Sequence, residues 1–255
     1  MSTLPQKKID RLRTIMLVAC KKRFKRSRIP KYGSINKGFT ESELELFFRN
    51  VKNGKFRLLF KYQAYLGLRI GEVCRLNLSN IDFDKRELTL KTEKSQMMDS
   101  LKIPLGLFRE TTEFIHSHAK AIEKSNGFIF YKDNDNNKNG LPHIDENYAR
   151  KVFREAVVAS NLDADYGESD ESLYHRTPRT LHKLTTHSLR HYAITKFAKS
   201  SNGNVVLTSR FARHSNPAMT MRYIAKDNEQ LYEQIENIFS VNQVKSLKSR
   251  LVHTP

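Results

Sequence analysis

Cysteine and long apolar segments are scarce in this sequence. Its 255 residues include only two cysteines, Cys20 and Cys74. Two thiols are too few for a disulfide framework or a cysteine-rich zinc site, which favours a reducing, cytoplasmic setting. No apolar run approaches the roughly 20 residues that a membrane span requires. The short apolar stretch 14–20 is followed at once by KKRFKR, which is typical of a basic helix and not of a signal peptide. We therefore expect a cytoplasmic protein with no membrane partner.

Acidic residues are also few. The chain has 27 Asp and Glu against 45 Lys and Arg, which gives a formal net charge of +18 at pH 7. Such an excess indicates a polyanionic partner, and DNA or RNA is the commonest one. Composition leaves open a basic protein that binds ribosomes or membranes without specificity. The length suits one hydrophobic core with a small extra lobe.

Residues 1–38 concentrate this charge, with twelve Lys and Arg against the single acid Asp10. Apolar residues at helical spacing predict a basic amphipathic helix in this arm, which Pro30 and Gly33 would end. One interpretation is that the arm contacts DNA phosphates, with a basic cluster made up of Lys21, Lys22, Arg23, Lys25, Arg26 and Arg28. A disordered solubilising tail is the other interpretation.

The pattern beyond this arm predicts a mainly α fold with one small antiparallel β-sheet, that is, an α+β protein. Thr40 and Glu43 form a capping-box signature before an apolar helix, and Gly67 is a stop signal for a helix at 56–66. Further helices are expected at 107–122 and 146–159, and a series of helices from 186 to about 239. Short strands are expected at 81–83, 88–90 and 101–103, and a long connection at 161–183. The order lacks the regular strand–helix alternation of a nucleotide-binding fold. We expect a folded domain at 39–240 and a C-terminal tail at 241–255.

The first of three chemically suggestive segments is GLRIGEV, residues 67–73. Arg69 stands between two glycines just after an apolar helix, where its planar fork can bind a phosphate. A salt bridge to Glu72 is the alternative that this segment alone leaves open.

The second segment is THSLRHY, residues 186–192. Thr186 would cap a helix whose first turn carries His187 and Arg190 on one face, at the positive helix end that suits a phosphate. Zinc binding is the competing interpretation. However, no carboxylate lies between His187 and His191 as in the HExxH arrangement, and Arg190 would repel a cation. No metal or other cofactor is expected.

The third segment is ARHSNP, residues 212–217, which leads to Tyr223, nine residues beyond His214. Ser215 or Asn216 would cap a helix with Pro217 near its first turn. A helical tyrosine on its own is usually a half-buried core residue, so Tyr223 needs the other two segments to gain a functional interpretation.

Together the three segments resemble the tyrosine recombinase (phage integrase) family, including its Xer-type members, over roughly residues 38–240. GLRIGEV is similar to the family's first arginine motif, HSLRH to its His-x-x-Arg motif, and ARHSN with Tyr223 to its second histidine and nucleophile. The resemblance implies the tyrosine recombinase catalytic-domain fold. It also implies cleavage and rejoining of DNA through a 3′-phosphotyrosyl intermediate, without metal or ATP. The catalytic residues that it implies are Arg69, Lys94, His187, Arg190, His214 and the nucleophile Tyr223.

The resemblance also implies that a lysine on a β-hairpin turn gives the leaving 5′-oxygen its proton. The corresponding region, 88–95, offers two lysines. We choose Lys94, which is nearer the turn and better spaced from Pro104, and Lys91 is the alternative. Glu72 matches an acid of the family motif and would buttress Arg69 without reacting.

The implied partner is double-stranded DNA at a specific site, in the nucleoid or in a mobile element. The family also assembles through the segment after the nucleophile, which implies a homotetramer on DNA; packing of residues 231–239 within the chain is the alternative. Most members carry a helical DNA-clamping domain before the catalytic one, whereas only the basic arm precedes Thr40 here. Two other functions stay open: a type IB topoisomerase-like enzyme, and a catalytically inactive DNA-binding protein on the same fold.

Overall fold

The computed structural model describes residues 38–91, 98–133, 141–168, 180–214, 216–221 and 223. Contacts between residues divide the chain into two units, Met1–Asn36 and Lys37–Pro255, and all described residues belong to the second. The basic cluster at 21–28, Lys94 and the C-terminal segment lie outside the described residues. No helix in the described ranges combines the length and the apolar composition needed to cross a membrane.

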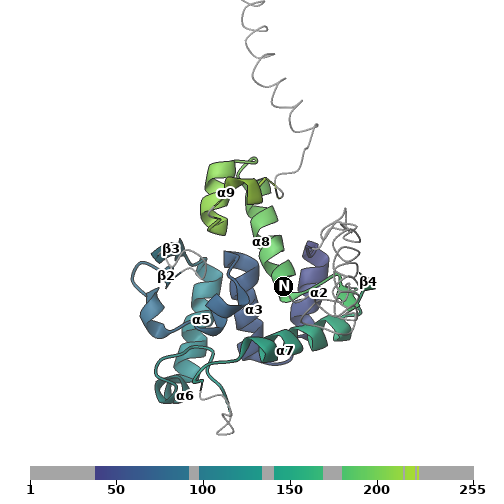
Figure 1. Ribbon diagram of the computed structural model, residues 1–255. Coiled ribbons are helices and arrows are strands. Elements are labelled where there is room, and N and C mark those ends of the chain that lie inside the picture. The colour runs from purple at the N-terminus through teal and green to yellow at the C-terminus, as the bar shows by residue number, and fades with distance from the viewer. Residues whose placement is uncertain are drawn as a thin grey trace, which may run out of the picture. The chain divides into compact units, whose positions relative to one another are not determined.

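Helix α3 (Gly54–Leu66) is the centre of the core, because residues on nearly all of its faces are buried. It packs against α8 (Thr186–Ser200) on one side and α5 (Leu105–Ser117) on the other (Figure 1). The Tyr62 hydroxyl and the Thr111 hydroxyl lie 2.9 Å apart across the contact with α5. Burial raises the pKa of Tyr62 to about 12, so this hydroxyl stays protonated. The helix expected at 56–66 is confirmed, and it ends at Leu66, before the left-handed Gly67.

Helices α2 (Glu41–Asn50) and α7 (Glu146–Ala159) close the core against α3 through aromatic side chains. The ring centroids of Phe47 and Phe153 are 5.0 Å apart, and each lies 5.6 Å from the Phe60 ring. Buried aromatic clusters of this kind contribute strongly to stability. The expected capping box of α2 is present: the Thr40 N–H donates to Glu43 Oε2 at 2.8 Å, and the Glu43 N–H donates to Thr40 Oγ1 at 3.2 Å.

The predicted small sheet is confirmed as three antiparallel strands: β1 (Ile81–Asp82), β2 (Glu87–Lys91) and β3 (Met98–Lys102). Leu88 and Leu90 alternate into the core from β2. Strand β3 begins at Met98, three residues earlier than the sequence indicated. None of its residues is fully buried, so the sequence of its first half shows no apolar alternation by which a strand could be recognised. The sheet is held beside α5, whose N-terminus follows β3 after two residues.

Two segments differ from the predictions. The expected helix at 107–122 is two helices, α5 and α6 (Ala119–Lys124), because the backbone leaves the helical conformation at His118 (φ −120°, ψ 18°). The expected connection at 161–183 contains an antiparallel pair, β4 (Asp165–Glu168) and β5 (Thr180–His182). Neither strand has the apolar alternation by which strands are recognised in a sequence.

The chain reaches the functional segments through short elements: α4 (Ile70–Cys74), the 3₁₀ helix η1 (Leu78–Asn80), α9 (Val205–Ala212) and η2 (Pro217–Met219). The N-cap of α8 is Thr185 and not Thr186, since the Thr185 N–H donates to Ser188 Oγ at 3.0 Å. The Asn216 side chain caps only a 3₁₀ turn, accepting from the Ala218 N–H at 2.9 Å. Tyr223 consequently lies in a turn, not in the helix that the sequence suggested.

Gly67 gives a test of how α3 ends. It adopts the left-handed conformation (φ 61°, ψ 29°), and an added Cβ would meet its nearest neighbour, Phe211 Cε1, at an ordinary 3.5 Å. Gly67→Ala should therefore lower the free energy of unfolding by about 1–2 kcal/mol through backbone strain alone. Gly54→Ala, in open space in the first turn of α3, should raise it by about 0.4–1 kcal/mol. Urea denaturation measures both free energies of unfolding. Equal changes for Gly67→Ala and Gly54→Ala would contradict the left-handed conformation of Gly67.

Candidate functional site

The turn between α3 and α4 presents Arg69. Its backbone is extended (φ −75°, ψ 153°), and it serves as the N-cap residue of α4. The Arg69 N–H donates to Glu72 Oε2 at 2.8 Å, and Arg69 Nη1 donates to Glu72 Oε1 at 2.9 Å. Glu72 thus fixes both the backbone and the guanidinium of Arg69, as the sequence predicted, while the Arg69 side chain stays 16% exposed.

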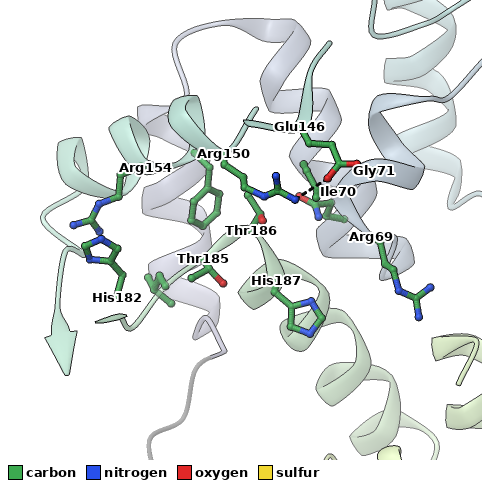
Figure 2. A pocket seen from close by; sticks show the side chains of 13 residues that line it. Arg69, Ile70, Gly71, Glu146, Arg150, Arg154, His182, Thr185, Thr186 and His187 are labelled. Atoms are coloured by element: carbon green, nitrogen blue, oxygen red, sulfur yellow. Dashed lines mark hydrogen bonds and ion pairs between the residues drawn. The ribbon is translucent and has the colours of Figure 1, made fainter. Parts of the chain in front are cut away.

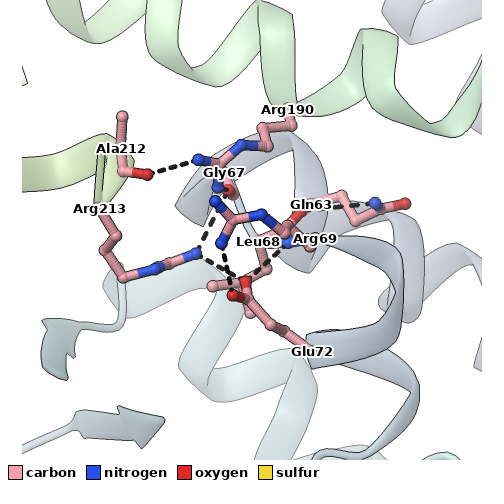
Figure 3. Close-up of polar contacts among 8 residues, drawn as sticks. All are labelled: Gln63, Gly67, Leu68, Arg69, Glu72, Arg190, Ala212 and Arg213. Atoms are coloured by element: carbon pink, nitrogen blue, oxygen red, sulfur yellow. Dashed lines mark hydrogen bonds and ion pairs between the residues drawn. The ribbon is translucent and has the colours of Figure 1, made fainter. Parts of the chain in front are cut away.

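Glu72 is buried, so its contact with Arg69 is not the surface salt bridge that the sequence left open. A second cation, Arg213, donates from Nη2 to Glu72 Oε2 at 2.8 Å (Figure 3). Burial on its own would raise the pKa of the Glu72 carboxyl, but the positive charges of Arg213 and Arg69 outweigh it and hold that pKa below its ordinary value. The carboxylate is therefore ionised and shared between two arginines.

Arg190 is the largest fully buried side chain among the described residues. It extends from α8 and donates hydrogen bonds from Nη1 to the Gly67 carbonyl and from Nη2 to the Ala212 carbonyl. Burial, together with the nearby charges of Arg69 and Arg213, lowers the pKa of Arg190 to about 9. Near neutral pH the guanidinium remains charged.

Arg69, Arg190, Arg213 and Glu72 together form what we call the arginine cluster (Figure 3). Two guanidinium groups bind the one carboxylate, and the third, that of Arg190, lies within electrostatic range of it, so the cluster carries an excess of two positive charges. Buried charge without full compensation is costly, and a bound anion would reduce that cost. The cluster can therefore receive an anion such as a phosphate, which guanidinium groups bind through paired hydrogen bonds.

Tyr223 lies beside this cluster, between two histidines. Its ring centroid is 4.5 Å from that of His191 and 5.9 Å from that of His214. The Tyr223 N–H donates to the Thr220 carbonyl at 2.9 Å, and His214 Nδ1 lies 3.0 Å from Thr220 Oγ1. The negative charge of ionised Tyr223, like that of Glu72, acts to raise the pKa of Arg190, which places the phenol within electrostatic range of the cluster.

His187 is exposed in the first turn of α8, and its ring centroid lies 6.0 Å from that of His191, the histidine nearer to Tyr223. It lines a pocket of about 600 Å³ together with Arg69 (Figure 2). The far end of this pocket is lined by Arg154 and His182, with Arg150 between the two ends (Figure 2). The pocket thus leads away from the arginine cluster; Glu146 also lines it and pairs with Arg150, and Arg154 pairs with Asp163.

The structure brings together most of the predicted catalytic residues. Arg69 and Arg190 lie in the arginine cluster. Tyr223 lies within electrostatic range of Arg190, the His214 ring lies against the Tyr223 ring, and His187 lines the adjoining pocket. Lys94 lies outside the described residues, and Lys91, the alternative, is exposed at the end of β2.

Two residues of the site were not predicted: Arg213, which stands directly before His214, and His191, which was considered only as a metal ligand. Arg213 lies within the ARHSNP segment and His191 within the THSLRHY segment. Their only sequence signal was therefore that each stands next to a predicted catalytic residue. Their partners come from distant segments. Arg213 binds Glu72, 141 residues away, and no local pattern encodes that contact.

The ion pair between Glu72 and Arg213 gives a stability prediction. Glu72→Gln leaves Arg213 as an uncompensated buried cation, and should lower the free energy of unfolding by about 3 kcal/mol at pH 7. The matched control is Glu45→Gln, which removes an exposed ion pair with Arg49 and should cost at most about 0.5 kcal/mol. Urea denaturation measures both.

The loss should also depend on pH. Because the pKa of folded Glu72 lies below its ordinary value, its charge stabilises the protein fully above about pH 5. That stabilisation disappears as the pH falls through the lowered folded pKa. The difference between wild type and Glu72→Gln should therefore shrink on acidification, and a difference that stays constant down to pH 3 would contradict the ionised pair.

Comparisons with known proteins agree with this fold. The tyrosine recombinase XerC of Pseudomonas syringae is 25% identical over 180 residues, which cover 69% of this chain and 33% of that protein. The chain thus spans about a third of the length of this curated relative.

Three solved structures are similar in fold. The XerA recombinase has a TM-score of 0.57 at 15% identity, covering 79% of this chain and 65% of that one. The Tn1549 transposon integrase, in complex with a circular intermediate DNA, has a TM-score of 0.58 at 20% identity, with coverages of 79% and 65%. The catalytic domain of bacteriophage HP1 integrase has a TM-score of 0.50 at 19% identity, with coverages of 79% and 94%.

The family model described as the phage integrase family matches residues 37–230, well over half of the sequence. That range includes all of the arginine cluster, the two histidines beside Tyr223, and Tyr223 itself. This match confirms the resemblance drawn from the three sequence motifs, and the chain belongs to the phage integrase family.

Proposed function

We propose that this chain is a site-specific DNA recombinase or integrase that cleaves and rejoins DNA through a covalent link to Tyr223. The observation that carries the proposal is the arginine cluster, with its excess of positive charge, beside a tyrosine ring. Phosphodiester cleavage passes through a five-coordinate state whose non-bridging oxygens gain negative charge. Fixed guanidinium groups stabilise that charge without reorganising during the reaction.

The proposed reaction has two steps. The phenolic oxygen of Tyr223 attacks phosphorus, an O–P bond forms, and the bond to the 5′-oxygen breaks. The products are a 3′-phosphotyrosyl link and a free 5′-hydroxyl. Attack by a 5′-hydroxyl then reverses the step and releases Tyr223. Because the covalent link conserves the energy of the broken bond, rejoining requires no ATP.

The remaining groups take supporting roles in the proposal. Arg69 and Arg190 bind the non-bridging oxygens, and His214 donates a hydrogen bond to one of them. His187 orients a phosphate oxygen or takes the phenolic proton. Lys94 gives a proton to the leaving 5′-oxygen. Since the arginines supply the positive charge, the proposed reaction requires no metal, and EDTA should leave its rate unchanged.

Double-stranded DNA is the proposed partner. The net charge of +18 supports it, as do the basic side chains that line the pocket next to the cluster. The structurally similar Tn1549 integrase was solved in complex with DNA. The proposal includes a basic arm at 1–38 that contacts DNA phosphates, a catalytic domain at 39–240, and a tail at 241–255. It also includes a homotetramer on DNA, joined through the segment after Tyr223, acting on nucleoid or mobile-element DNA in the cytoplasm.

Covalent capture tests the nucleophile. The substrate is a pool of duplexes with randomised sequence, each with a nick near its centre. Cleavage near the nick releases a short fragment, so the strand cannot be rejoined and the protein–DNA adduct is trapped. Wild type should form an adduct that survives denaturing electrophoresis, and Tyr223→Phe should form none. Arg69→Ala should reduce the rate by about 100-fold or more on a duplex recovered from the pool. The matched control is Tyr65→Phe, at a 42% exposed residue of α3, which should retain the wild-type rate.

Two results would overturn the proposal. If wild type captures no duplex from the pool, the enzyme proposal fails. If Tyr223→Phe forms the same adduct as wild type, the nucleophile is wrong. A plasmid that carries two copies of a site recovered from the pool distinguishes a recombinase from a topoisomerase-like enzyme. A recombinase joins the two sites, whereas a topoisomerase-like enzyme only relaxes the supercoils.

Replacing the leaving 5′-oxygen with sulfur tests the choice of Lys94 over Lys91. A thiolate is a far better leaving group than an alkoxide and needs no proton. Lys94→Ala should therefore cleave the oxygen substrate about 100-fold or more slowly, yet cleave the sulfur substrate at nearly the wild-type rate. Lys91→Ala should stay within about threefold of wild type on both substrates. Rescue of Lys91→Ala by sulfur, without rescue of Lys94→Ala, would assign the proton to Lys91.

A further inference from the structure

Arg213 occupies a backbone position that favours glycine. It ends α9 in the left-handed conformation (φ 53°, ψ 46°), which is the conformation that Gly67 adopts at the end of α3. Residues with a Cβ are disfavoured there, and glycine is the usual choice at the end of a helix. A large side chain at a strained position suggests that the side chain makes a contact whose stabilisation outweighs the backbone strain.

That contact is the ion pair with Glu72. Only 2% of the Arg213 side chain and 1% of the Glu72 side chain are exposed. Arg213 Nη2 lies 2.8 Å from Glu72 Oε2 and 3.5 Å from the Gly67 carbonyl oxygen. Since Glu72 also binds Arg69, a single carboxylate joins the end of α9 to the turn that presents Arg69.

The Arg213 backbone continues directly into the segment that carries the nucleophile. His214 is the next residue, and its Nδ1 lies 3.0 Å from Thr220 Oγ1. The Thr220 carbonyl accepts from the Tyr223 N–H at 2.9 Å. A displacement of Arg213 would therefore be transmitted through two hydrogen bonds to the backbone of Tyr223.

We propose that Arg213 is a positioning residue, whose ion pair with Glu72 holds the segment bearing His214 and Tyr223 in register with Arg69. This inference rests on the proposed function, and it assigns to Arg213 a role that acts through Glu72. The buried side chain does not reach out to DNA. Arg213 Nε and Nη1 are buried without a hydrogen-bond partner among the described residues, so Glu72 is the one anionic group that Arg213 contacts there.

The proposal has a pH signature. The charged groups that face Glu72 are Arg69 from the turn before α4, Arg190 from α8 and Arg213 from the end of α9. Burial lowers the pKa of Arg213, whereas the negative charge of Glu72 and, more weakly, that of Asp99 in β3 act to raise it. Removal of Arg213 takes away the largest charge effect that lowers the pKa of Glu72. That pKa then rises, and Glu72 begins to lose its charge at a higher pH than in wild type.

Four variants test the proposal: Arg213→Gly, Arg213→Lys, Glu72→Gln and the double variant Glu72→Gln with Arg213→Gly. Glycine suits the left-handed backbone, so Arg213→Gly removes the ion pair without adding strain. The matched control is Arg210→Ala, which removes an exposed positive charge from the same helix, α9. The single-turnover rate of adduct formation is measured at saturating DNA, and the dissociation constant for DNA is measured separately.

We expect Arg213→Gly to form adduct about 10- to 100-fold more slowly than wild type, because misplacement of a reacting group by a fraction of an ångström has effects of this size. The dissociation constant should stay within about threefold, and the acid limb of the rate profile should move to higher pH. Arg213→Lys restores the charge and should recover most of the rate. Arg210→Ala should stay within about twofold of wild type in rate.

Two results would overturn the positioning role: a wild-type rate for Arg213→Gly, or a loss of rate with no shift of the acid limb and no rescue by lysine. Urea denaturation of the double-mutant cycle, which comprises wild type, Arg213→Gly, Glu72→Gln and the double variant, is independent of catalysis. It should show a coupling of about tenfold or more between Glu72 and Arg213 in the unfolding equilibrium. If wild type forms no adduct but this coupling is present, the proposed function has failed and the ion pair stands; if the coupling is absent, the ion pair itself is wrong.

Discussion

The buried Glu72 carboxylate is the interaction on which the site depends. It accepts hydrogen bonds from the Arg69 backbone, the Arg69 guanidinium and the Arg213 guanidinium, using both of its oxygens. A buried carboxylate so enclosed stays ionised and keeps its partners in fixed positions. Removal of the Glu72 carboxylate would leave the buried Arg213 guanidinium without its counter-ion, so the positions of Arg69 and Arg213 both depend on Glu72.

The helices around this carboxylate bring together distant parts of the chain. The Gly67 carbonyl, turned by the left-handed end of α3, accepts from Arg190, 123 residues away in sequence. The Ala212 carbonyl at the end of α9 accepts from the same guanidinium. Arg190 therefore joins α3, α8 and α9, and it is buried because it lies where these helices meet. The site is a product of the tertiary fold, and no single segment could form it alone.

Local signals determined what the sequence could predict. The capping box at Thr40, the glycine stop after α3 and the apolar face of α7 are encoded within a few residues, and the structure confirms them. Strands β4 and β5 were missed because they lack apolar alternation. The expected start of a helix at Pro217 was wrong, because a cap signal and a proline do not distinguish a 3₁₀ turn from a longer helix.

The site shows the same division between local and distant information. The motifs identified the residue types suited to phosphate chemistry, and the match to the phage integrase family confirms the family that they indicated. They did not reveal Arg213 as a partner of Glu72, because the partners of an arginine are set by helix packing. The identity of a reactive group is local information, whereas the electrostatic environment that tunes it is not.

The imbalance of charge in the cluster links stability to function. Three guanidinium groups with one carboxylate are less stable than a balanced set. Burial lowers the pKa of both Arg190 and Arg213, and the positive charges of their neighbours lower it further. A second buried carboxylate would relieve this cost, but it would also repel a phosphate. In the proposed reaction a phosphodiester would supply the missing negative charge when it binds, so binding would offset a cost that the free protein carries. In that reaction the arginine cluster would stabilise the additional negative charge of the transition state more strongly than the charge of the bound substrate. Such a difference accelerates a reaction, whereas equal stabilisation of both states only tightens binding.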